Sequence, residues 1–331
     1  MAKMKYFYEL TISSSPHAHS PVTTQTIMRD VLIALLPALA GSVYFFGLRA
    51  LMVTMVSAAA CVFFEWGYRK LMKLDSTVWD LSAVVTGVLL AFVCPVTIPY
   101  WCIIIGDFFA IIVVKQLFGG IGQNFVNPAL AARAFLFSWP VLMSNWVKVG
   151  FENAAGIFDT ADAVTAATPL AAMHQGSLPA ESVLDLFLGN VGGCIGETSA
   201  LLLLIGFAYL LLRKVISIRI PLAFLGTVAV LTFLFPLGND RILWMASQVF
   251  GGGLMLGAIF MATDYVTSPV TKWGQVIFGI GCGALTVVIR YFGGYNEGVS
   301  YAILVMNACV VLLDKIGRPK KFGAPKKEAA K

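Results

Sequence analysis

Charged residues are scarce in this sequence. Asp, Glu, Lys and Arg make up 12% of its 331 residues and hydrophobic residues make up 59%, whereas soluble domains carry about 25% charged and about 45–50% apolar residues. The composition therefore excludes a soluble globular domain and indicates a polytopic membrane protein. No continuous apolar run occurs near the N-terminus, so we expect no cleavable signal peptide.

Several signatures of catalytic and metal sites are also missing. The chain has no phosphate-binding Walker loop, no GxGxxG turn after a strand and no serine-hydrolase elbow. Its six cysteines occur singly in or beside apolar segments, so we expect buried small side chains rather than a disulfide framework or a zinc site. His17 and His19 form a pair with no third ligand nearby, and no metal site is expected there.

Long apolar segments dominate what is present. A helix that spans a membrane needs about 20 predominantly apolar residues, and by this measure the chain has about ten spans. The first two pairs of spans have very short connections. We expect an all-α polytopic membrane protein with helices at roughly 30–48, 50–68, 78–96, 98–117, 126–144, 188–212, 220–236, 243–262, 275–291 and 299–314.

The distribution of positive charge predicts the orientation. With residues 1–29 placed in the cytoplasm, 19 of the 23 Lys and Arg residues, Arg133 among them, fall on the cytoplasmic side and 4 on the other. This bias fits the positive-inside rule with both termini in the cytoplasm. The basic tail, residues 315–331, then faces anionic membrane lipid, so the formal charge of +6 does not require a nucleic-acid partner.

A polar stretch divides the chain into two membrane halves of about five spans each. An odd number of spans per half makes the halves inverted relative to one another, an arrangement that often builds a site near the membrane midplane. Each half also has a break rich in Gly, Asn and Pro, and the faint internal similarity leaves the repeat a hypothesis. The polar stretch is 147–187, the halves are 30–146 and 188–314, and the breaks are 119–128 and 251–253 with 263–269.

The central polar stretch contains Thr168, which is preceded by two alanines and followed by Pro169. Pro169 biases Thr168 towards an extended backbone, whereas the hydroxyl of a helical threonine bonds back to a backbone carbonyl. An open hydroxyl with methyl-sized neighbours can carry a bulky covalent group. The same composition is typical of an ordinary linker, so the stretch by itself does not decide between the two. The predicted topology places it outside the cytoplasm.

Ionisable residues inside apolar spans are costly, so each one is a functional candidate. Glu65 and Asp80 fall near span ends beside tryptophans, and we interpret them as interfacial anchors. Asp107 and Arg133 are candidates either for a structural ion pair between neighbouring helices or for a ligand or ion pathway.

Two further carboxylates lie close to polar breaks. Glu197 comes early in the span after the central loop, which places it on the same side of the membrane as Thr168. Asp264, with Thr263 beside it, lies in the second break among hydroxyl side chains. Unwound backbone with hydroxyls and a carboxylate suits a polar ligand or a hard cation, and it suits a helix-capping turn equally well.

Six stretches taken together resemble one family. They occur in the family's order and extend over nearly the whole chain, at residues 14–20, 119–135, 165–170, 196–199, 260–269 and 298–307. These stretches resemble the RnfD component of the Rnf ion-translocating electron-transport complex and, more distantly, the NqrB component of the sodium-pumping NADH:quinone oxidoreductase.

In that family the last threonine of a Ser/Thr-Gly/Ala-Ala-Thr consensus carries FMN through a phosphoester bond. By position, the resemblance implies that this residue is Thr168, with Thr165 and Ala167 beside it. Ala166 stands where the family commonly has Gly, and we expect its methyl group to slow the attachment without preventing it. We expect an acidic neighbour such as Asp162 to disfavour the anionic reduced flavin.

The resemblance implies further properties. It implies a flavin on the extracytoplasmic side with Glu197 near it, and a ten-helix inverted-repeat bundle similar to that of urea transporters. It also implies a second, non-covalent riboflavin, whose residues the sequence does not place. The expected partners are other membrane and peripheral subunits of the complex, including a second FMN-bearing subunit and iron–sulfur subunits, at a bacterial cytoplasmic membrane.

Three functions are open from the sequence. The first is an electron-carrier subunit of an Rnf-type complex that couples electron transfer between ferredoxin and NAD to movement of sodium ions or protons. No ferredoxin or NAD site is visible, so no complete active site is expected on this chain. The second is a solute channel or transporter with the same inverted repeat, in which Asp264 and Glu197 line a pathway and Thr168 is an ordinary loop residue. The third is a membrane scaffold without a cofactor.

Overall fold

The computed structural model describes residues 22–143, 145–147 and 168–316. Within these ranges the regular elements are helices, so the predicted all-α class is confirmed. Some residues singled out by the sequence lie outside the described ranges, namely His17, His19, Asp162, Thr165, Ala166 and Ala167.

The first half begins with two long helices. Thr23 caps the first one, because its hydroxyl accepts a hydrogen bond from the Thr26 backbone (3.3 Å) while the Thr26 hydroxyl accepts one from the Thr23 backbone (3.0 Å). Gly47, with φ of 79°, turns the chain directly into the second helix. The elements of this half are α2 (Thr24–Phe46), α3 (Leu48–Leu71), the 3₁₀ turn η1 (Val78–Asp80), α4 (Ser82–Phe92), α5 (Tyr100–Phe108), the π-helix η2 (Phe109–Gln116), α6 (Pro128–Leu136) and α7 (Pro140–Met143).

Two short helices, α8 (Pro169–His174) and α9 (Val183–Leu188), precede the second half. That half contains a sharply bent segment, in which the helix axis turns by 62° at a short glycine-rich break after Phe250. Its elements are α10 (Ala200–Leu212), α11 (Arg219–Leu234), α12 (Arg241–Phe250), α13 (Leu254–Leu256), the π-helix η4 (Gly257–Met261), α14 (Lys272–Phe292) and α15 (Val299–Leu313).

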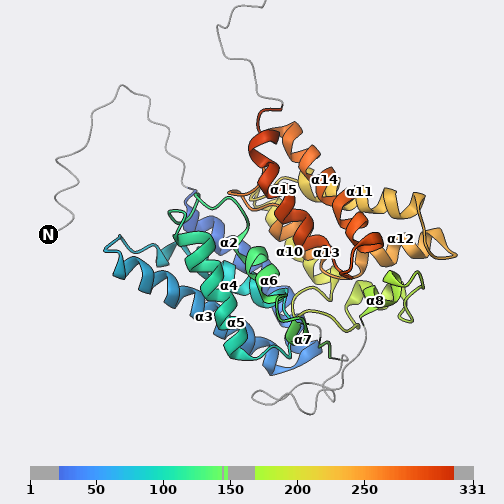
Figure 1. Cartoon of the computed structure of the whole chain (residues 1–331), viewed down its shortest axis with the longest axis horizontal. Helices are drawn as coiled ribbons and strands as arrows, with labels where there is room; N and C mark the ends of the chain where they lie inside the picture. The colour runs from blue at the N-terminus through green and yellow to red at the C-terminus, as the bar shows by residue number, and fades with distance from the viewer. Residues whose placement is uncertain (1–21, 144, 148–167, 317–331) are drawn as a thin grey trace, which may run out of the picture.

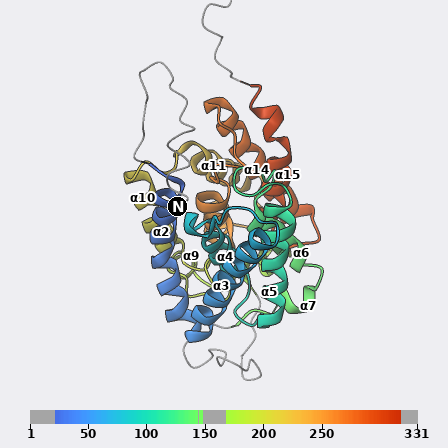
Figure 2. The same ribbon diagram turned by 90° about the vertical axis from the view of Figure 1, so that its left-hand side faces the viewer.

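The two halves form two groups of helices side by side. Figure 1 shows α2 to α7 in one group and α10 to α15 in the other. In the first group α3 packs on α4 and α5, and α5 packs on α6. In the same order, α11 of the second group packs on α12 and α14, and α14 packs on α15. α2 and α10 pack on one another across the groups. The start of α2 and the end of α15 lie toward the same end of the molecule in both views (Figures 1 and 2).

Glycines allow the close packing of α11 and α14. A Cβ atom at Gly279 would lie 2.9 Å from the backbone oxygen of Ile220, and one at Gly283 would lie 2.9 Å from the backbone oxygen of Phe224. These glycines are one helical turn apart on one face of α14. Small residues in this spacing bring helix backbones together in membranes, where van der Waals contact drives association.

Two broken segments meet inside the bundle. α4 ends at Phe92, and the chain before α10 is irregular, yet the two connect through backbone hydrogen bonds. Ile195 donates to the Cys94 carbonyl and Gly196 donates to the Phe92 carbonyl, each at 3.0 Å. A Cβ atom at Gly196 would collide with the Phe92 side chain, so only glycine fits there. This crossing fixes the position of the next residue, Glu197.

Three of the described helices are long and apolar enough to cross a membrane, namely α2, α3 and α14 with 23, 24 and 21 residues, and the bent segment from α12 to η4 adds a fourth if it counts as one span. Each of the ten predicted segments contains a helix, but several helices are short, and the segment 188–212 is continuous helix only from Ala200. The chain is a helical membrane protein, and the count of ten spans stays a prediction.

Candidate functional site

A cavity of about 300 Å³ lies where the two halves meet, beside α7 and α8. This volume is at the lower end of the range of small-molecule sites, about 300–1,000 Å³. Both Thr168 and Glu197 line it, so we call it the Thr168 cavity. The other lining residues that matter below are Arg133, Phe137, Trp146, Leu170, Phe250, Gly252, Tyr295 and Glu297.

Thr168 lies directly before α8 with an extended backbone, at φ −75° and ψ 150°. This is the conformation that the following Pro169 predicts. Thr168 occupies the N-cap position of α8, yet its side chain makes no capping hydrogen bond to the helix. Thr168 therefore lines the cavity, and its hydroxyl takes no part in capping the start of α8.

The short helix α8 is fixed to the second half of the bundle. Leu170 and Met173 are buried against Trp244 of α12. At the end of α8, the Nδ1 atom of His174 lies 2.8 Å from the Arg290 backbone oxygen. These contacts fix α8, and with it the preceding Thr168, against α12 and α14.

Arg133 carries a buried positive charge into the cavity. Its guanidinium contacts the Glu297 carboxylate at 2.5 Å and donates to the Ser300 hydroxyl at 2.9 Å, and its Cζ atom lies 5.5 Å from the centre of the Phe137 ring. Arg133 belongs to α6 and Glu297 to the loop between α14 and α15, so this ion pair joins the two halves. The charge count placed Arg133 on the cytoplasmic side and the Thr168 loop on the other side, whereas the structure brings the Arg133 side chain to the cavity that Thr168 lines.

Two carboxylates approach each other across Gly253. Glu297 accepts a hydrogen bond from the Gly253 backbone at 2.6 Å, and Glu197 accepts one from the Cys194 backbone at 3.4 Å. Burial raises the pKa of the Glu297 carboxyl, and the guanidiniums of Arg133 and Arg290 outweigh burial and hold this pKa below its ordinary value. The Oε2 atom of Glu197 is buried and has no hydrogen-bond partner among the described residues.

Aromatic side chains form much of the cavity wall. Phe137, Trp146, Phe250 and Tyr295 all line it. Flat apolar walls of this kind suit a planar ring system, while a few convergent polar groups fix its orientation. The donors and charges of the preceding paragraphs supply such groups on one side of the cavity. The residues present therefore fit a planar aromatic ligand attached through the Thr168 hydroxyl.

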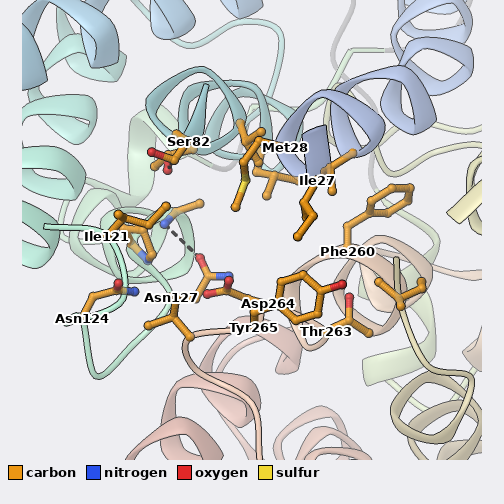
Figure 3. A pocket seen from close by; sticks show the side chains of 18 of the residues that line it. Ile27, Met28, Ser82, Ile121, Asn124, Asn127, Phe260, Thr263, Asp264 and Tyr265 are labelled. Atoms are coloured by element: carbon orange, nitrogen blue, oxygen red, sulfur yellow. Dashed lines mark hydrogen bonds between the residues drawn. The ribbon is translucent and has the colours of Figure 1, made fainter. Parts of the chain in front are cut away.

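A second, smaller cavity of about 90 Å³ lies at the other end of the bundle, and we call it the Asp264 cavity. Figure 3 shows its side chains, with Asn124, Asn127 and Asp264 on one side and Ile27 and Met28 of α2 opposite them. α14 separates the two cavities: the Asp264 cavity includes residues just before this helix, and the Thr168 cavity includes residues just after it. With 21 residues, α14 is about 31 Å long.

The Asp264 cavity brings together the two predicted breaks. Asn127 caps α6 by accepting from the Ala129 backbone at 3.0 Å, and it donates to the Met261 carbonyl in the other half at 3.3 Å. Asp264 accepts a hydrogen bond from the Thr267 hydroxyl at 3.1 Å, and the hydroxyl of Thr263 donates to the Ile259 carbonyl at 2.5 Å. Helix capping thus explains Asn127 in the first break, whereas Asp264 and Thr263 make their hydrogen bonds to residues within four positions of them, and Thr271 caps α14.

Comparisons with known proteins show the family of the chain. A family model described as the NQR2, RnfD, RnfE family matches residues 11–323. The chain belongs to this family. Similar proteins include a component of the Na(+)-translocating ferredoxin:NAD(+) oxidoreductase complex of Acetobacterium woodii, with 50% identity over 96% of each chain. Its proton-translocating counterpart in Clostridium ljungdahlii shares 43% identity over 95% of this chain and 96% of its own.

A third relative has a more general name. It is a component of the ion-translocating oxidoreductase complex of Stutzerimonas stutzeri and is 39% identical, over 90% of this chain and 91% of its own. The resemblance noted in the sequence motifs is thereby confirmed at the level of the family.

Within this NQR2, RnfD, RnfE family member, the candidate pathway residues are not brought together. Asp264 and Thr263 lie at one cavity and Arg133 at the other. Asp107 lines neither cavity and does not pair with Arg133, so the predicted ion pair was wrong. Instead, Asp107 accepts hydrogen bonds from Ser57 at 2.7 Å and Cys61 at 3.2 Å, because α3 rather than α6 faces its carboxylate.

The interpretation of Glu65 as an interfacial anchor was also wrong. Its side chain is 1% exposed and pairs with Lys115 of η2 at 2.8 Å. The Lys115 ammonium also donates to the Ser82 hydroxyl at 2.7 Å. The pair exists because α3 and η2 pack together with both charges turned inward. Asp80 is half-buried in η1, beside the exposed Trp79, in keeping with an anchor.

Two charged residues of the Thr168 site were missed in the sequence. Glu297 lies in the loop between the last two helices, and Arg290 lies in the last turn of α14 and is 2% exposed. The charge count placed Arg290, at a span end, among the four Lys and Arg residues outside the cytoplasm. A glycine-rich sequence follows Arg290. It is the signal that could have indicated the burial of Arg290, because a loop with few large side chains can fold back into the bundle.

Proposed function

We propose that this chain is the membrane electron-carrier subunit of an Rnf-type complex, which couples electron transfer between ferredoxin and NAD to ion translocation. Two relatives whose names state such activities align with more than nine-tenths of this chain, at 50% and 43% identity. One name specifies sodium and the other protons, so the ion moved is one of these two. The catalytic sites for ferredoxin and NAD lie on other membrane and peripheral subunits, including a second FMN-bearing subunit and iron–sulfur subunits.

The chain carries FMN as a phosphoester on Thr168. The observation that carries this proposal is the position of the Thr168 hydroxyl, which lies at a cavity of about 300 Å³ with aromatic walls and is not used as a helix cap. The buried Nε atom of Arg133 and Oε2 atom of Glu197 have no partner among the described residues. Such atoms are costly to bury unless a ligand or water completes their hydrogen bonding.

Bound FMN supplies the redox chemistry at its ring, and the protein supplies position and electrostatics. The bond to Thr168 keeps the ring at the cavity without a need for high non-covalent affinity. Phe137, Phe250 and Tyr295 give the cavity aromatic walls. The Arg133–Glu297 pair contributes almost no net charge, while the Arg133 Nε–H remains available to a negative atom in the cavity.

The Thr168 cavity faces the extracytoplasmic side, and the Asp264 cavity faces the cytoplasm, with both termini on the cytoplasmic side. The bias of positive charge supports this orientation. The spans form two inverted halves of five, similar to urea transporters, and the repeated packing order of the helices supports this arrangement. The exposed apolar faces of the bundle contact lipid or neighbouring subunits.

The resemblance also implies a non-covalent riboflavin. The Asp264 cavity, at about 90 Å³, is far below the about 300 Å³ at which small-molecule sites begin. A riboflavin there would need α2 to move away from the breaks. The proposal therefore assigns riboflavin to the protein without assigning residues to it.

In-gel flavin fluorescence under denaturing conditions tests the proposal. The protein is produced in its native host, or in a host that supplies the flavin transferase, as the native sequence, as Thr168→Ala and as the matched control Thr198→Ala, a threonine of the same cavity. We expect a fluorescent band for the native protein and the control, and none for Thr168→Ala. A dark native band would refute the electron-carrier function and favour the solute transporter. A fluorescent Thr168→Ala band would move the attachment to another residue, with Thr165 the next to test.

A further inference from the structure

The pair of carboxylates beside the Thr168 cavity is unusual for a membrane protein. Glu197 is 6% exposed, and the Glu297 side chain is 13% exposed. A Cβ atom built at Gly253 would collide with Glu197 Oε2 and with Glu297 Oε1. The two oxygens therefore approach the same point, and glycine at 253 is what leaves space for them.

The two carboxylates differ in the positive charges and hydrogen-bond donors that contact them. Glu297 makes an ion pair with Arg133 and accepts a backbone hydrogen bond from Gly253. Arg290 is the second buried guanidinium nearby, but it donates to the Gln248 side chain and to backbone oxygens of Gln248 and Gly251, at 2.6–3.1 Å. Neither guanidinium bonds to Glu197.

Glu197 has different surroundings. Its Oε1 atom accepts one backbone hydrogen bond from Cys194, whose buried thiol also lies close to it. Its Oε2 atom has no partner among the described residues and lies next to a second carboxylate. A buried ionised carboxylate without a cation costs several kcal/mol, and two carboxylates in one site do not both ionise readily.

We infer that Glu197 is held as a neutral carboxylic acid at the Thr168 cavity and is the proton donor that compensates negative charge arriving in that cavity. This inference rests on the proposed function, and its proton and electron are accounted for as follows. When an electron enters the group on Thr168, the Oε2–H bond of Glu197 breaks and its proton passes to that group. Glu197 becomes a carboxylate, and a proton from water at the open side of the cavity restores the acid. The electron comes from the donor side of the complex.

The Arg133–Glu297 ion pair makes this role specific to Glu197. Glu297 stays ionised beside Arg133 and cannot serve as an acid without losing that pair. It also repels a second negative charge at Glu197, which favours return of the proton after transfer. The two carboxylates thus have separate roles, one as a fixed charge and the other as a carrier of one proton.

Infrared spectroscopy tests the protonation independently of the flavin. The carbonyl stretching band of a carboxylic acid lies at higher frequency than the bands of a carboxylate or an amide, and it shifts in heavy water. We expect native protein and flavin-free Thr168→Ala protein to show a buried acid band at neutral pH. The band should be lost in Glu197→Gln, which keeps the shape of the side chain, and should persist in Glu197→Asp. Absence of the band from native protein, or an unchanged band in Glu197→Gln, would overturn the inference.

The second readout is the rate at which the covalent flavin takes up a proton after reduction, followed by its absorbance in water and in heavy water. A positioned general acid speeds proton transfer by about 10²-fold or more. We expect Glu197→Gln to slow this protonation by about that factor, and Glu197→Asp to keep most of the rate. Equal rates in all three would refute the donor role. If native protein carries no flavin, the proposed function fails, while the infrared result still decides whether Glu197 is protonated.

Discussion

The buried ion pair between Arg133 and Glu297 allows a quantitative prediction. The two side chains are 3% and 13% exposed and lie 2.5 Å apart, so neither charge is well hydrated. Removal of one partner from a buried pair leaves an uncompensated charge and costs about 3–5 kcal/mol. Arg133→Met should therefore lower the free energy of unfolding by about this amount. Arg133→Met combined with Glu297→Gln leaves no charge behind, and it should recover most of the loss.

Thermal and denaturant unfolding of purified protein in detergent measures these changes. A matched control is Arg219→Met, because Arg219 is exposed and donates a hydrogen bond to the neutral side chain of Gln275 at 3.3 Å. A surface substitution of this kind changes the free energy of unfolding by about 0.5 kcal/mol or less, so this control should unfold almost as the native protein does. The reasoning would be refuted if Arg219→Met destabilised the protein as much as Arg133→Met, or if the double variant were no more stable than the single one.

Two further predictions follow from the other end of the bundle. Lys115→Met should lower the free energy of unfolding by about 3–5 kcal/mol, since it strands the buried Glu65 charge, and adding Glu65→Gln should restore most of it; a single variant as stable as the native protein in the same unfolding assay would contradict this. Asp264→Asn should leave covalent flavin fluorescence unchanged, because Asp264 lines the cavity at the opposite end from the attachment site, and loss of the in-gel signal from correctly folded protein would show that the two ends are coupled.

The sequence predicted the helical class and the position of most helices because both follow from local composition. Apolar stretches of sufficient length predict helices in a membrane. Thr168 and its extended backbone could be predicted from Pro169 alone, since a proline restricts the residue before it. The order of the segments predicted Thr168 and Glu197 on the same side of the membrane, because Glu197 follows soon after the loop that contains Thr168. The structure adds that both line one cavity.

Contacts between distant parts of the chain could not be predicted. Arg133 and Glu297 are 164 residues apart, and no local pattern relates them. The same holds for Glu65 and Lys115, which are 50 residues apart. Glu65 and Lys115 lie near predicted span ends, and both side chains turn inward because α3 packs on η2. Hydropathy indicates where a span ends, but it does not indicate which face of the helix is covered.

The bends and breaks were only partly predictable. The glycines at 251–253 indicated a break, but not the turn of 62° in the helix axis. The irregular chain before α10 was predicted to be part of a span, because its residues are small and apolar. It is irregular because Gly196 crosses Phe92 and its backbone bonds to the broken end of α4. That crossing depends on a pair of segments about 100 residues apart in the sequence.

Mass spectrometry of the proteolytic peptide that contains Thr168 tests the central claim most directly. The protein is purified from a host that supplies the flavin transferase, digested, and fragmented so that Thr165 and Thr168 are resolved. We expect the peptide to be heavier by FMN less one water, with the added mass on Thr168 and none on Thr165. An unmodified peptide from such a host, or the added mass on any other residue, would contradict the assignment of the cofactor to the Thr168 cavity.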